Sequence, residues 1–445
     1  MQFGPAPPTE SGPRVIELDG FTAPANIPDA GQSYVVFGKA NGDPVDLSEV
    51  LEGDGGFAIN GIDPYDYSGV SVSGAGDING DGFDDLIIGA GDANGPTYAE
   101  YSRGETYVVF GSDDTDTVDL TEIALDANDG GFILNSIDGG DLSGSSVNGA
   151  GDVNGDGMDD LIIGARLGDP NAVSAGETYL VFGKDDGMAV NLSDVADGVG
   201  GLVLNGIDNG DQSGFSVSGA GDVNGDGFDD LIVGAPFADL VADGEGQSYV
   251  IYGRDFTNTV DFLGDGNNNF FVGTAAAEVF VGGGGNDIMA GNGGADVLRG
   301  GAGDDQLTVL NADFMRVAGG SGSDRFQMEG AFDLDLTVDV PRNAISGIEE
   351  IFLSGFGGNT LALDVSNVIG VTEGANLKPD NAQFQAVNTL VVTGDNFDTL
   401  DIDLGAGGFS DTGLDTTVDG QAGYSVFDHA TSNARIVVED EISVI

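Results

Sequence analysis

The feature that most constrains the fold of this chain is a 20-residue phrase that occurs three times. It reads Ser-Val-Ser-Gly-Ala-Gly-Asp-Ile-Asn-Gly-Asp-Gly-Phe-Asp-Asp-Leu-Ile-Ile-Gly-Ala at 71–90 and returns with few changes at 146–165 and 216–235. The copies are offset by 75 and then 70 residues. Such a period indicates a repeat architecture, in which each unit is one supersecondary element that stacks on the next.

Each unit also contains two further short apolar segments. A Tyr-Val-Val-Phe-Gly strand begins at Tyr34, Tyr107, Tyr179 and Tyr249, and a Gly-Phe-x-Leu-Asn strand contains Phe57, Phe132 or Leu202. About four short strands separated by Gly, Asp and Asn turns are typical of one blade of a β-propeller. Residues 56–253 supply three full units, and residues 14–38 match the second and third strands of another. We therefore expect an all-β domain of propeller-like blades at 1–262, three full and one partial at the N-terminus.

The number of units leaves two ways of closing the propeller open. Propellers typically have about 4–8 blades, and exposed blade edges aggregate unless they are paired. Either the N-terminal half-blade is completed to give a small four-bladed ring, or two chains join. Two such arcs would total about seven blades, which lies within that range.

The acidic loop inside the repeated phrase predicts calcium binding. Calcium requires six to eight oxygen ligands, and a tight loop with alternate side chains turned inward delivers them, while a glycine at position 6 permits the sharp turn. Ile88 stands at position 12, where an EF-hand has glutamate, so the ligand set ends early, at position 9. The predicted ligands at positions 1, 3, 5, 7 (through the backbone carbonyl) and 9 are Asp77, Asn79, Asp81, Phe83 and Asp85, then Asp152, Asn154, Asp156, Met158 and Asp160, then Asp222, Asn224, Asp226, Phe228 and Asp230.

A second repeat follows, with a period of nine residues. Residues 282–308 read Gly-Gly-x-Gly-x-Asp-x-apolar-x, which is the pattern of a calcium-binding parallel β-roll. Two nonapeptides make one coil, so residues 18 apart lie on the same side. Asp287 then pairs with Asp305, and Glu278 with Asp296, each pair able to share calcium. Asp324 comes 19 residues after Asp305, and its place in a site is left open. We expect the roll at 263–327 and a metal-free, β-rich C-terminal cap at 328–445.

The charge of the chain restricts its partners. It has 76 acidic and 12 basic residues, a formal net charge of −64. Such a surface repels nucleic acid and anionic lipid, so we expect neither as a partner. The absence of cysteine excludes disulfides, zinc–thiolate sites and thiol nucleophiles. No apolar run approaches the roughly 18 residues that a membrane helix needs, so no membrane insertion is expected.

Catalytic signatures are missing from the sequence. It has no His-Glu-x-x-His, Gly-x-Ser-x-Gly or phosphate-binding loop. The single histidine, His429, is interpreted as a surface or structural residue. We therefore expect no enzyme and no catalytic residue. The N-terminal residues lack the basic and apolar segments of a secretory signal peptide, so export would require another route.

Three segments resemble known families. The units at 56–253 resemble FG-GAP repeats, the blades of the integrin α-chain propeller, at the loops and at the Gly-Ala pairs that follow them. Residues 264–327 resemble repeats-in-toxin (RTX) nonapeptides. The acidic and then apolar ending at 438–445 is similar to the C-terminal region of type I secretion substrates. The resemblance implies a Gram-negative bacterial protein that is exported unfolded in one step and folds outside the cell on binding several Ca²⁺ ions.

Three functions are compatible with these features. The leading hypothesis is a secreted, non-enzymatic surface, matrix or adhesion protein that self-assembles as a homo-oligomer, in a surface layer or a filament. The second is a monomeric module that binds a cell-surface glycan or protein through the propeller. The third is a hydrolase with a calcium-stabilised propeller.

Overall fold

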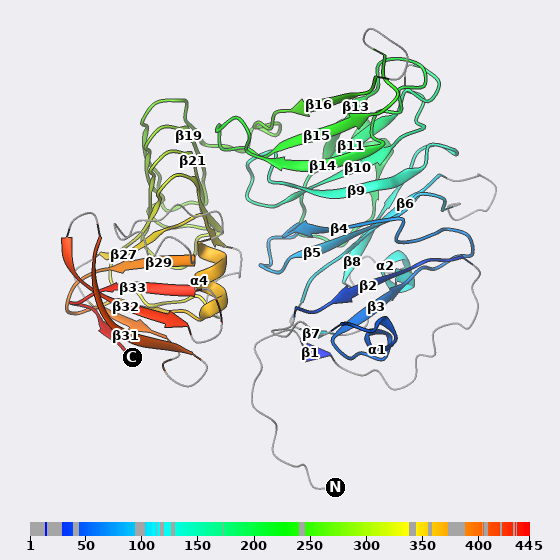
Figure 1. Ribbon diagram of the computed structural model, residues 1–445. Coiled ribbons are helices and arrows are strands. Elements are labelled where there is room, and N and C mark those ends of the chain that lie inside the picture. Colours follow the sequence, from blue (N-terminus) through cyan, green and yellow to red (C-terminus); the bar gives the residue numbers. More distant parts are fainter. Residues whose placement is uncertain are drawn as a thin grey trace.

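The computed structural model shows an all-β chain in which two repeat arrays lie side by side (Figure 1). The elements of the first array run through blue and green, and those of the second through green, yellow and red. No helix in the described part of the chain is long and apolar enough to cross a membrane. The structure describes residues 14–15, 29–38, 44–93, 103–112, 114–115, 120–125, 130–170, 172–239, 245–337, 344–354, 358–372, 388–402, 404, 408–418, 421–429, 432 and 434–445.

The first array is an arc of stacked antiparallel sheets, which confirms the predicted propeller blades. Its half-blade holds β2 (Gln32–Val36) and β3 (Gly56–Asn60). The first full blade holds β4 (Ser71–Gly76), β5 (Asp85–Ala90), β6 (Glu105–Val109) and β8 (Gly131–Asn135). The second holds β9 (Ser143–Gly151), β10 (Asp160–Ala165), β11 (Glu177–Val181) and β13 (Gly201–Asn205). The third blade holds β14 (Ser216–Gly221), β15 (Asp230–Ala235) and β16 (Gln247–Ile251).

The blades are offset by one strand from the repeat units of the sequence. The Gly-Phe-x-Leu-Asn strand that opens each unit hydrogen-bonds to the strand before it and so becomes the fourth strand of the preceding blade. The third blade therefore has three strands, because the chain enters the second array directly after β16.

Two details of the half-blade differ from the sequence prediction. Of the segment expected as its second strand, the structure describes Arg14–Val15, which form β1 and pair in parallel with β7 (Asp114–Thr115), while residues 16–28 lie outside the described residues. A short helix also joins the third and fourth strands, as α1 (Leu47–Leu51), α2 (Leu120–Leu125) and α3 (Leu192–Ala196), the last preceded by β12 (Val190–Asn191). These helices have five or six residues, too few to show helical periodicity in the sequence.

Apolar side chains on facing strands hold neighbouring blades together. Ile87 and Val108 of the first full blade pack against Leu161 and Ile163 of the second, and all four are buried. The second blade repeats this arrangement against the third. The first full blade and the second blade therefore each bury one apolar face against the blade before and the other face against the blade after.

The second array is a parallel β-roll, as predicted. Its coils alternate between two sheets, and equivalent residues of successive coils are 18 apart, as in the pairing of Ile288 with Gln306. One sheet contains β17 (Phe262–Leu263), β19 (Val279–Gly284), β21 (Val297–Ala302), β23 (Arg316–Ser321) and β26 (Ile345–Ser346). The other begins with β18 (Phe270–Val272), β20 (Ile288–Ala290), β22 (Gln306–Val309) and β24 (Arg325–Glu329).

The parallel ladder continues without a break into the C-terminal region. One apolar core runs from Phe280 to Ile442. The predicted limit of the roll at residue 327 lies inside β24, and the predicted start at 263 lies inside β17. The later elements are β25 (Leu334–Asp335), β27 (Glu350–Ser354), β28 (Thr360–Ala362), α4 (Val365–Val371), β29 (Asn388–Thr393), β30 (Thr399–Asp401), β31 (Phe409–Val418), β32 (Gln421–His429), β33 (Ala434–Glu439) and β34 (Ser443–Val444).

Candidate calcium sites

The acidic loop of the first full blade joins β4 to β5 and is folded around the carboxylate of Asp77. The Asp77 Oδ2 atom accepts a hydrogen bond from the Gly82 amide (2.9 Å), and its Oδ1 accepts one from the Asp81 amide (3.1 Å). Gly82 has a φ of +87°, a left-handed conformation that residues with a Cβ rarely adopt. Asn79 turns back into the same loop and accepts from the Asp81 amide (2.9 Å). The predicted ligands at positions 1, 3 and 5 therefore share one tight turn.

The aspartate at position 9 fixes the end of the acidic loop through buried hydrogen bonds. Asp85 is fully buried and accepts hydrogen bonds from the amides of Ile78 (2.9 Å) and Gly111 (2.8 Å). It thereby ties the loop to the start of the segment that follows β6. Asp160 and Asp230 accept the equivalent pairs of amides in the second and third loops.

The position-7 residues differ in their surroundings. The amides of Phe83, Met158 and Phe228 each donate to the position-5 aspartate of their own loop, at 2.9, 3.0 and 3.1 Å. Phe228 is buried, and its ring lies so close to Gly155 that a Cβ there would collide with it. The loops of neighbouring blades are thus in direct contact.

Burial of several like charges raises the pKa of the loop carboxyls. For Asp85 the pKa rises to about 7, mainly through burial and then through the nearby charges of Asp81 and Asp77. The pKa of Asp77 rises to about 6 and that of Asp156 to about 6, in both cases chiefly through burial. Carboxylates that repel one another in this way need either protons or a shared cation, and calcium is a cation suited to oxygen ligands.

A further aspartate at position 8 of the second and third loops, which the sequence interpretation did not identify, links neighbouring blades. Asp159 accepts a hydrogen bond from the Asp77 amide of the preceding blade (2.9 Å), and Asp229 accepts one from the Asp152 amide (2.9 Å). The signal available in the sequence was the Asp-Asp doublet, which all three copies contain. The loops therefore form a hydrogen-bonded row along one side of the arc.

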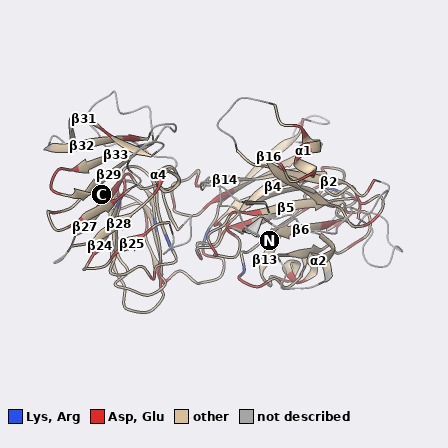
Figure 2. Ribbon diagram, turned by 90° about the horizontal axis from the view of Figure 1, so that it is seen from below, with Lys and Arg blue, Asp and Glu red and all other residues tan. Residues whose placement is uncertain are grey.

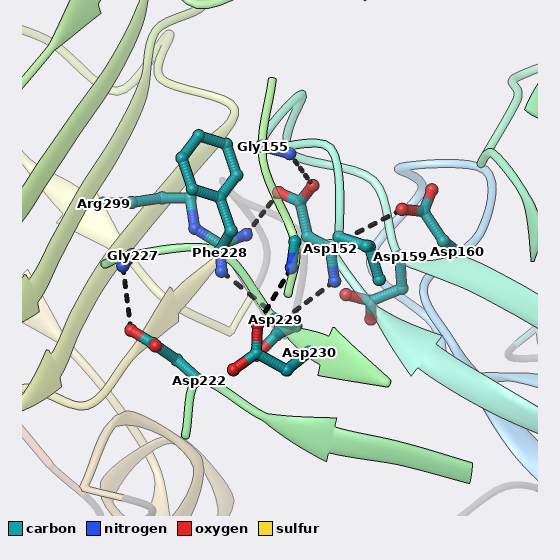
Figure 3. Close-up of polar contacts among 12 residues, drawn as sticks. Asp152, Gly155, Asp159, Asp160, Asp222, Gly227, Phe228, Asp229, Asp230 and Arg299 are labelled. Carbon is teal, nitrogen blue, oxygen red and sulfur yellow. Dashed lines mark hydrogen bonds and ion pairs between the residues drawn. The ribbon is translucent and has the colours of Figure 1, made fainter. Parts of the chain in front are cut away.

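Two arginines of the roll insert into this row, and Figure 3 shows one of them, Arg299, among the aspartates of the loops. Arg299 of β21 forms ion pairs with Asp152 and with Asp229 (3.4 Å to the latter), and Arg316 of β23 pairs with Asp159 (3.0 Å). Arg299 is almost completely buried, so its charge is paired in a region with little water. Among the described residues, the position-1 aspartate of the middle loop alone has an arginine partner. Sequence spacing could not reveal a contact across 147 residues.

In the roll, aspartates of successive coils form a column. The Oδ1 atom of each accepts a hydrogen bond from the backbone amide of its counterpart one coil earlier: Asp287 from Asn269 (2.6 Å), Asp305 from Asp287 (2.7 Å) and Asp324 from Asp305 (2.8 Å). The structure thus brings Asp287 and Asp305 together. It also places Asp324 in the same column, because the extra residue is accommodated before β23 and the pairing of β21 with β23 absorbs it.

The second oxygen of these aspartates fits a cation. The Oδ2 atoms of Asp287 and Asp305 are buried, and within the described residues no hydrogen bond reaches them. Each carboxylate folds over the first glycine of its own nonapeptide: a Cβ at Gly282 would lie 2.4 Å from the Asp287 oxygen, and one at Gly300 would lie 2.3 Å from that of Asp305. An acceptor buried without a donor is costly, and a calcium ion held between this oxygen and glycine carbonyls removes that cost.

The other predicted pair of the roll is only partly arranged in this way. Asp296 is buried and accepts a hydrogen bond from the Glu278 amide (3.0 Å), and burial raises its pKa to about 6. The carboxylate of Glu278 instead accepts from the amide and hydroxyl of Thr274, at 2.6 and 2.8 Å. The pair is adjacent, but the oxygens of Glu278 are occupied by its own turn.

The donor sets therefore suit calcium, with a restriction. In the described part of the chain, no three His, Cys, Asp or Glu side chains converge on one point. Complete coordination would have to include amide side chains and backbone carbonyls, which are the ligands that calcium takes in tight glycine-rich loops. The loops and the roll supply both.

Comparison with known families identifies both repeats. The FG-GAP repeat matches residues 68–109, 143–181 and 213–251, and the RTX calcium-binding nonapeptide repeat, with 4 copies, matches residues 272–307. The chain thus contains FG-GAP repeats followed by RTX repeats, and these repeats imply calcium binding. RTX repeats also suggest an extracellular protein.

Animal proteins are among the curated proteins that resemble this chain. The chain is 32% identical to phosphatidylinositol-glycan-specific phospholipase D of Bos taurus over 39% of its length, and 29% identical to integrin alpha-IIb of Mus musculus over 41%. It is 32% identical to integrin alpha pat-2 of Caenorhabditis elegans over 43%. These matches span 19%, 16% and 14% of the respective relatives, so the chain covers less than a fifth of each of these proteins.

The raised pKa values predict how the calcium-free protein responds to pH. A carboxyl whose pKa is higher in the folded than in the unfolded chain binds more protons when folded, so stability falls as pH rises between the two values. For Asp85 and Asp305 this window runs from about 4 to about 7. We expect thermal unfolding in EDTA to move to lower temperature as pH rises from 5, until the fold is lost near pH 7, and the stabilisation by 1 mM calcium to grow over the same range. A calcium effect independent of pH would contradict this assignment.

Substitution of Asp305 by Asn tests the column in the roll. The amide keeps the shape of the side chain but lacks the charge, so we expect at least one calcium ion fewer per chain and a roughly tenfold higher calcium concentration at half-folding. Calcium content after equilibrium dialysis and circular dichroism measure the two effects. Asp304→Asn is the matched control, because Asp304 is the exposed neighbour. Equal calcium content in both variants would exclude Asp305 as a ligand.

Proposed function

We propose that this protein is a secreted structural or adhesive protein of the bacterial cell surface or extracellular matrix, which folds on binding calcium and assembles with copies of itself. The observation that carries the proposal is the column of buried aspartates in the roll, each with one oxygen on a backbone amide. Such a column is stable only with a cation or with protons on its carboxyls.

The calcium requirement supports an extracellular location. Cytosolic calcium is far below millimolar, so the columns would remain charged and mutually repulsive inside the cell. The chain would stay unfolded there and fold after export, which is what one-step type I secretion from a Gram-negative bacterium requires. Acidic residues, red in Figure 2, occur throughout both arrays, so calcium neutralises a small part of a net charge of −64.

The position of the roll favours a structural role over ligand capture by the loop face. Val297 of the roll lies against Gly157, Val281 against Gly227 and Ala302 next to Gly225. These glycines belong to the second and third acidic loops, so the roll covers the side of the blades where those loops lie. A monomeric glycan- or protein-binding module would have to use another surface, and this is the second candidate.

A hydrolase remains the third candidate and has the least support. The name of one relative denotes a phospholipase, but the match spans 19% of that protein. The imidazole of His429 contacts the ring of Phe409 and the hydroxyl of Ser432 (2.8 Å) at the end of β32. This arrangement fastens a turn and supports a non-enzymatic protein.

A calcium titration tests the proposal. Purified protein in EDTA is titrated to 10 mM calcium while circular dichroism reports folding and mass photometry reports assembly. We expect strand signal and oligomers to appear together in the calcium series, and magnesium at equal concentration to produce neither, because Mg²⁺ demands smaller, regular octahedral sites. A folded monomer throughout would refute self-assembly and favour the binding module. Folding in EDTA at neutral pH would refute the calcium requirement.

A further inference from the structure

The two ends of the arc expose apolar surface that is buried everywhere else in it. At one end, the far face of the third blade holds Ile232, which is 38% exposed, whereas its counterparts Ile87 and Ile162 are 0% exposed. Val223 and Val250 of the same face are also exposed, although their counterparts in both full blades are buried. Figure 1 shows β16 and the half-blade strands β2 and β3 at opposite ends of the arc.

The other end of the arc also exposes apolar side chains whose counterparts are buried. Val72 of β4 is 56% exposed, whereas Val147 and Val217 at the same position are 3% and 5% exposed, because the described residues of the half-blade supply no inner strand to cover β4. Leu47 at the start of α1 is 46% exposed, whereas the equivalent leucines of α2 and α3 are buried against the preceding blade. Within the described ranges, no blade precedes this end of the arc and none follows the other.

The third blade also has a vacant position beside β16. In the second blade, α3 and β13 occupy this place: Leu192 and Val195 are buried against the first blade and against Tyr179. In the third blade the same place is an apolar pocket of about 300 Å³. It lies between β13 of the second blade and the strands β15 and β16, with Tyr249 and Ile251 in its wall.

The half-blade contains a segment whose sequence matches the segment that occupies this place in the second blade. Residues 45–60 of the half-blade, Val-Asp-Leu-Ser-Glu-Val-Leu-Glu-Gly-Asp-Gly-Gly-Phe-Ala-Ile-Asn, align without a gap with residues 190–205, which include α3 and β13. The present partner of β3 is β2, which reads Gln-Ser-Tyr-Val-Val, and β16 reads Gln-Ser-Tyr-Val-Ile. Strand β16 therefore offers β3 the same partner residues, in a blade that also has inner strands.

From these observations we propose that α1 and β3 (residues 45–60) of a second copy complete the third blade, by pairing β3 with the free edge of β16 and placing Leu47 in the pocket. This inference rests on the self-assembly in the proposed function and names its interface. Exchange of an identical element between copies costs little, because β3 gives up β2 and gains an equivalent strand. It also covers an exposed strand edge.

The exchange covers the exposed apolar surface at both ends of the arc. It places the inner strands of the third blade of one copy before β4 of the next, so that Ile232 and Val72 are both covered. The contact is head-to-tail, since opposite ends of the two chains meet, and such contacts form closed rings or open filaments. Two copies joined at both ends supply three blades each, six in all, which is within the usual range of about 4–8 and differs from the seven expected from counting repeats.

Engineered cysteines test the contact, because the chain has none of its own. In the half-blade Asn60 pairs with Gln32, and their side chains are 2.5 Å apart. The exchange pairs Asn60 with Gln247 of another copy. We therefore expect a mixture of Asn60→Cys and Gln247→Cys proteins, oxidised in 5 mM calcium, to give a disulfide-linked dimer of one chain of each kind. Each variant alone should give little dimer.

Three controls make the outcome decisive. Gln32→Cys/Asn60→Cys on one chain should form an intrachain disulfide in dilute, calcium-loaded monomer, which shows that the geometry permits the bond. If it forms while the mixture does not cross-link, the exchange is refuted. Efficient self-cross-linking of Gln247→Cys would show that two third blades meet, and a monomeric intrachain disulfide in Asn60→Cys/Gln247→Cys would show closure within one chain. Both results would overturn the proposal.

Leu47→Asp gives an independent readout. The side chain is half-exposed at the first turn of α1, where an acidic residue suits the helix N-terminus, so the single chain should fold normally by circular dichroism. We expect association, measured by mass photometry, to weaken at least tenfold, and Val173→Asp, at another exposed site, to leave it unchanged. Unchanged association in Leu47→Asp would refute this interface. Oligomers without the cross-link would refute the interface but not self-assembly, and a monomer at all concentrations would refute both.

Discussion

The stacking of carboxylates on backbone amides is the interaction on which the rest of this structure depends. In the roll, each aspartate of the column anchors the coil before it, and in the arc the position-8 aspartates Asp159 and Asp229 anchor the loop before them. The hydrogen bond from a backbone amide to an aspartate carboxylate of the next repeat therefore sets the spacing of both arrays. It concentrates like charges in buried places, which raises carboxyl pKa values and makes a bound cation part of the fold.

Ion pairs between arginines of the roll and aspartates of the acidic loops join the two arrays. Only 12 basic residues are present in the chain, yet Arg299 and Arg316 both lie where the roll meets the acidic loops. A buried guanidinium is tolerated there because Asp152 and Asp229 pair with it, and removal of both partners would leave an uncompensated buried charge. The roll is thus attached to the row of loops at a defined place, and calcium bound in the neighbouring loops would act on the same carboxylates.

The local parts of this architecture could be predicted from the sequence, and the long-range parts could not. The repeated phrase gives the blades and the acidic loops, and the nonapeptide period gives the parallel coils, because both reflect short-range spacing. The offset of blades from repeats could not be predicted, since it depends on whether β3 pairs with the strand before or after it. The partners of Arg299, and the place of Asp324 in the column, likewise follow from tertiary packing and from a strand register that absorbs one extra residue.

Hydrogen exchange at the amides of the column tests the central claim most directly. The amides of Asp287 and Asp305 each donate to the carboxylate of the next coil, so their protection reports whether the column exists. The account predicts rapid exchange at both amides in EDTA at pH 7.5, and at least ~100-fold slower exchange in millimolar calcium. Equal and strong protection in the two conditions would show that the aspartate column forms without a cation, and would contradict the account.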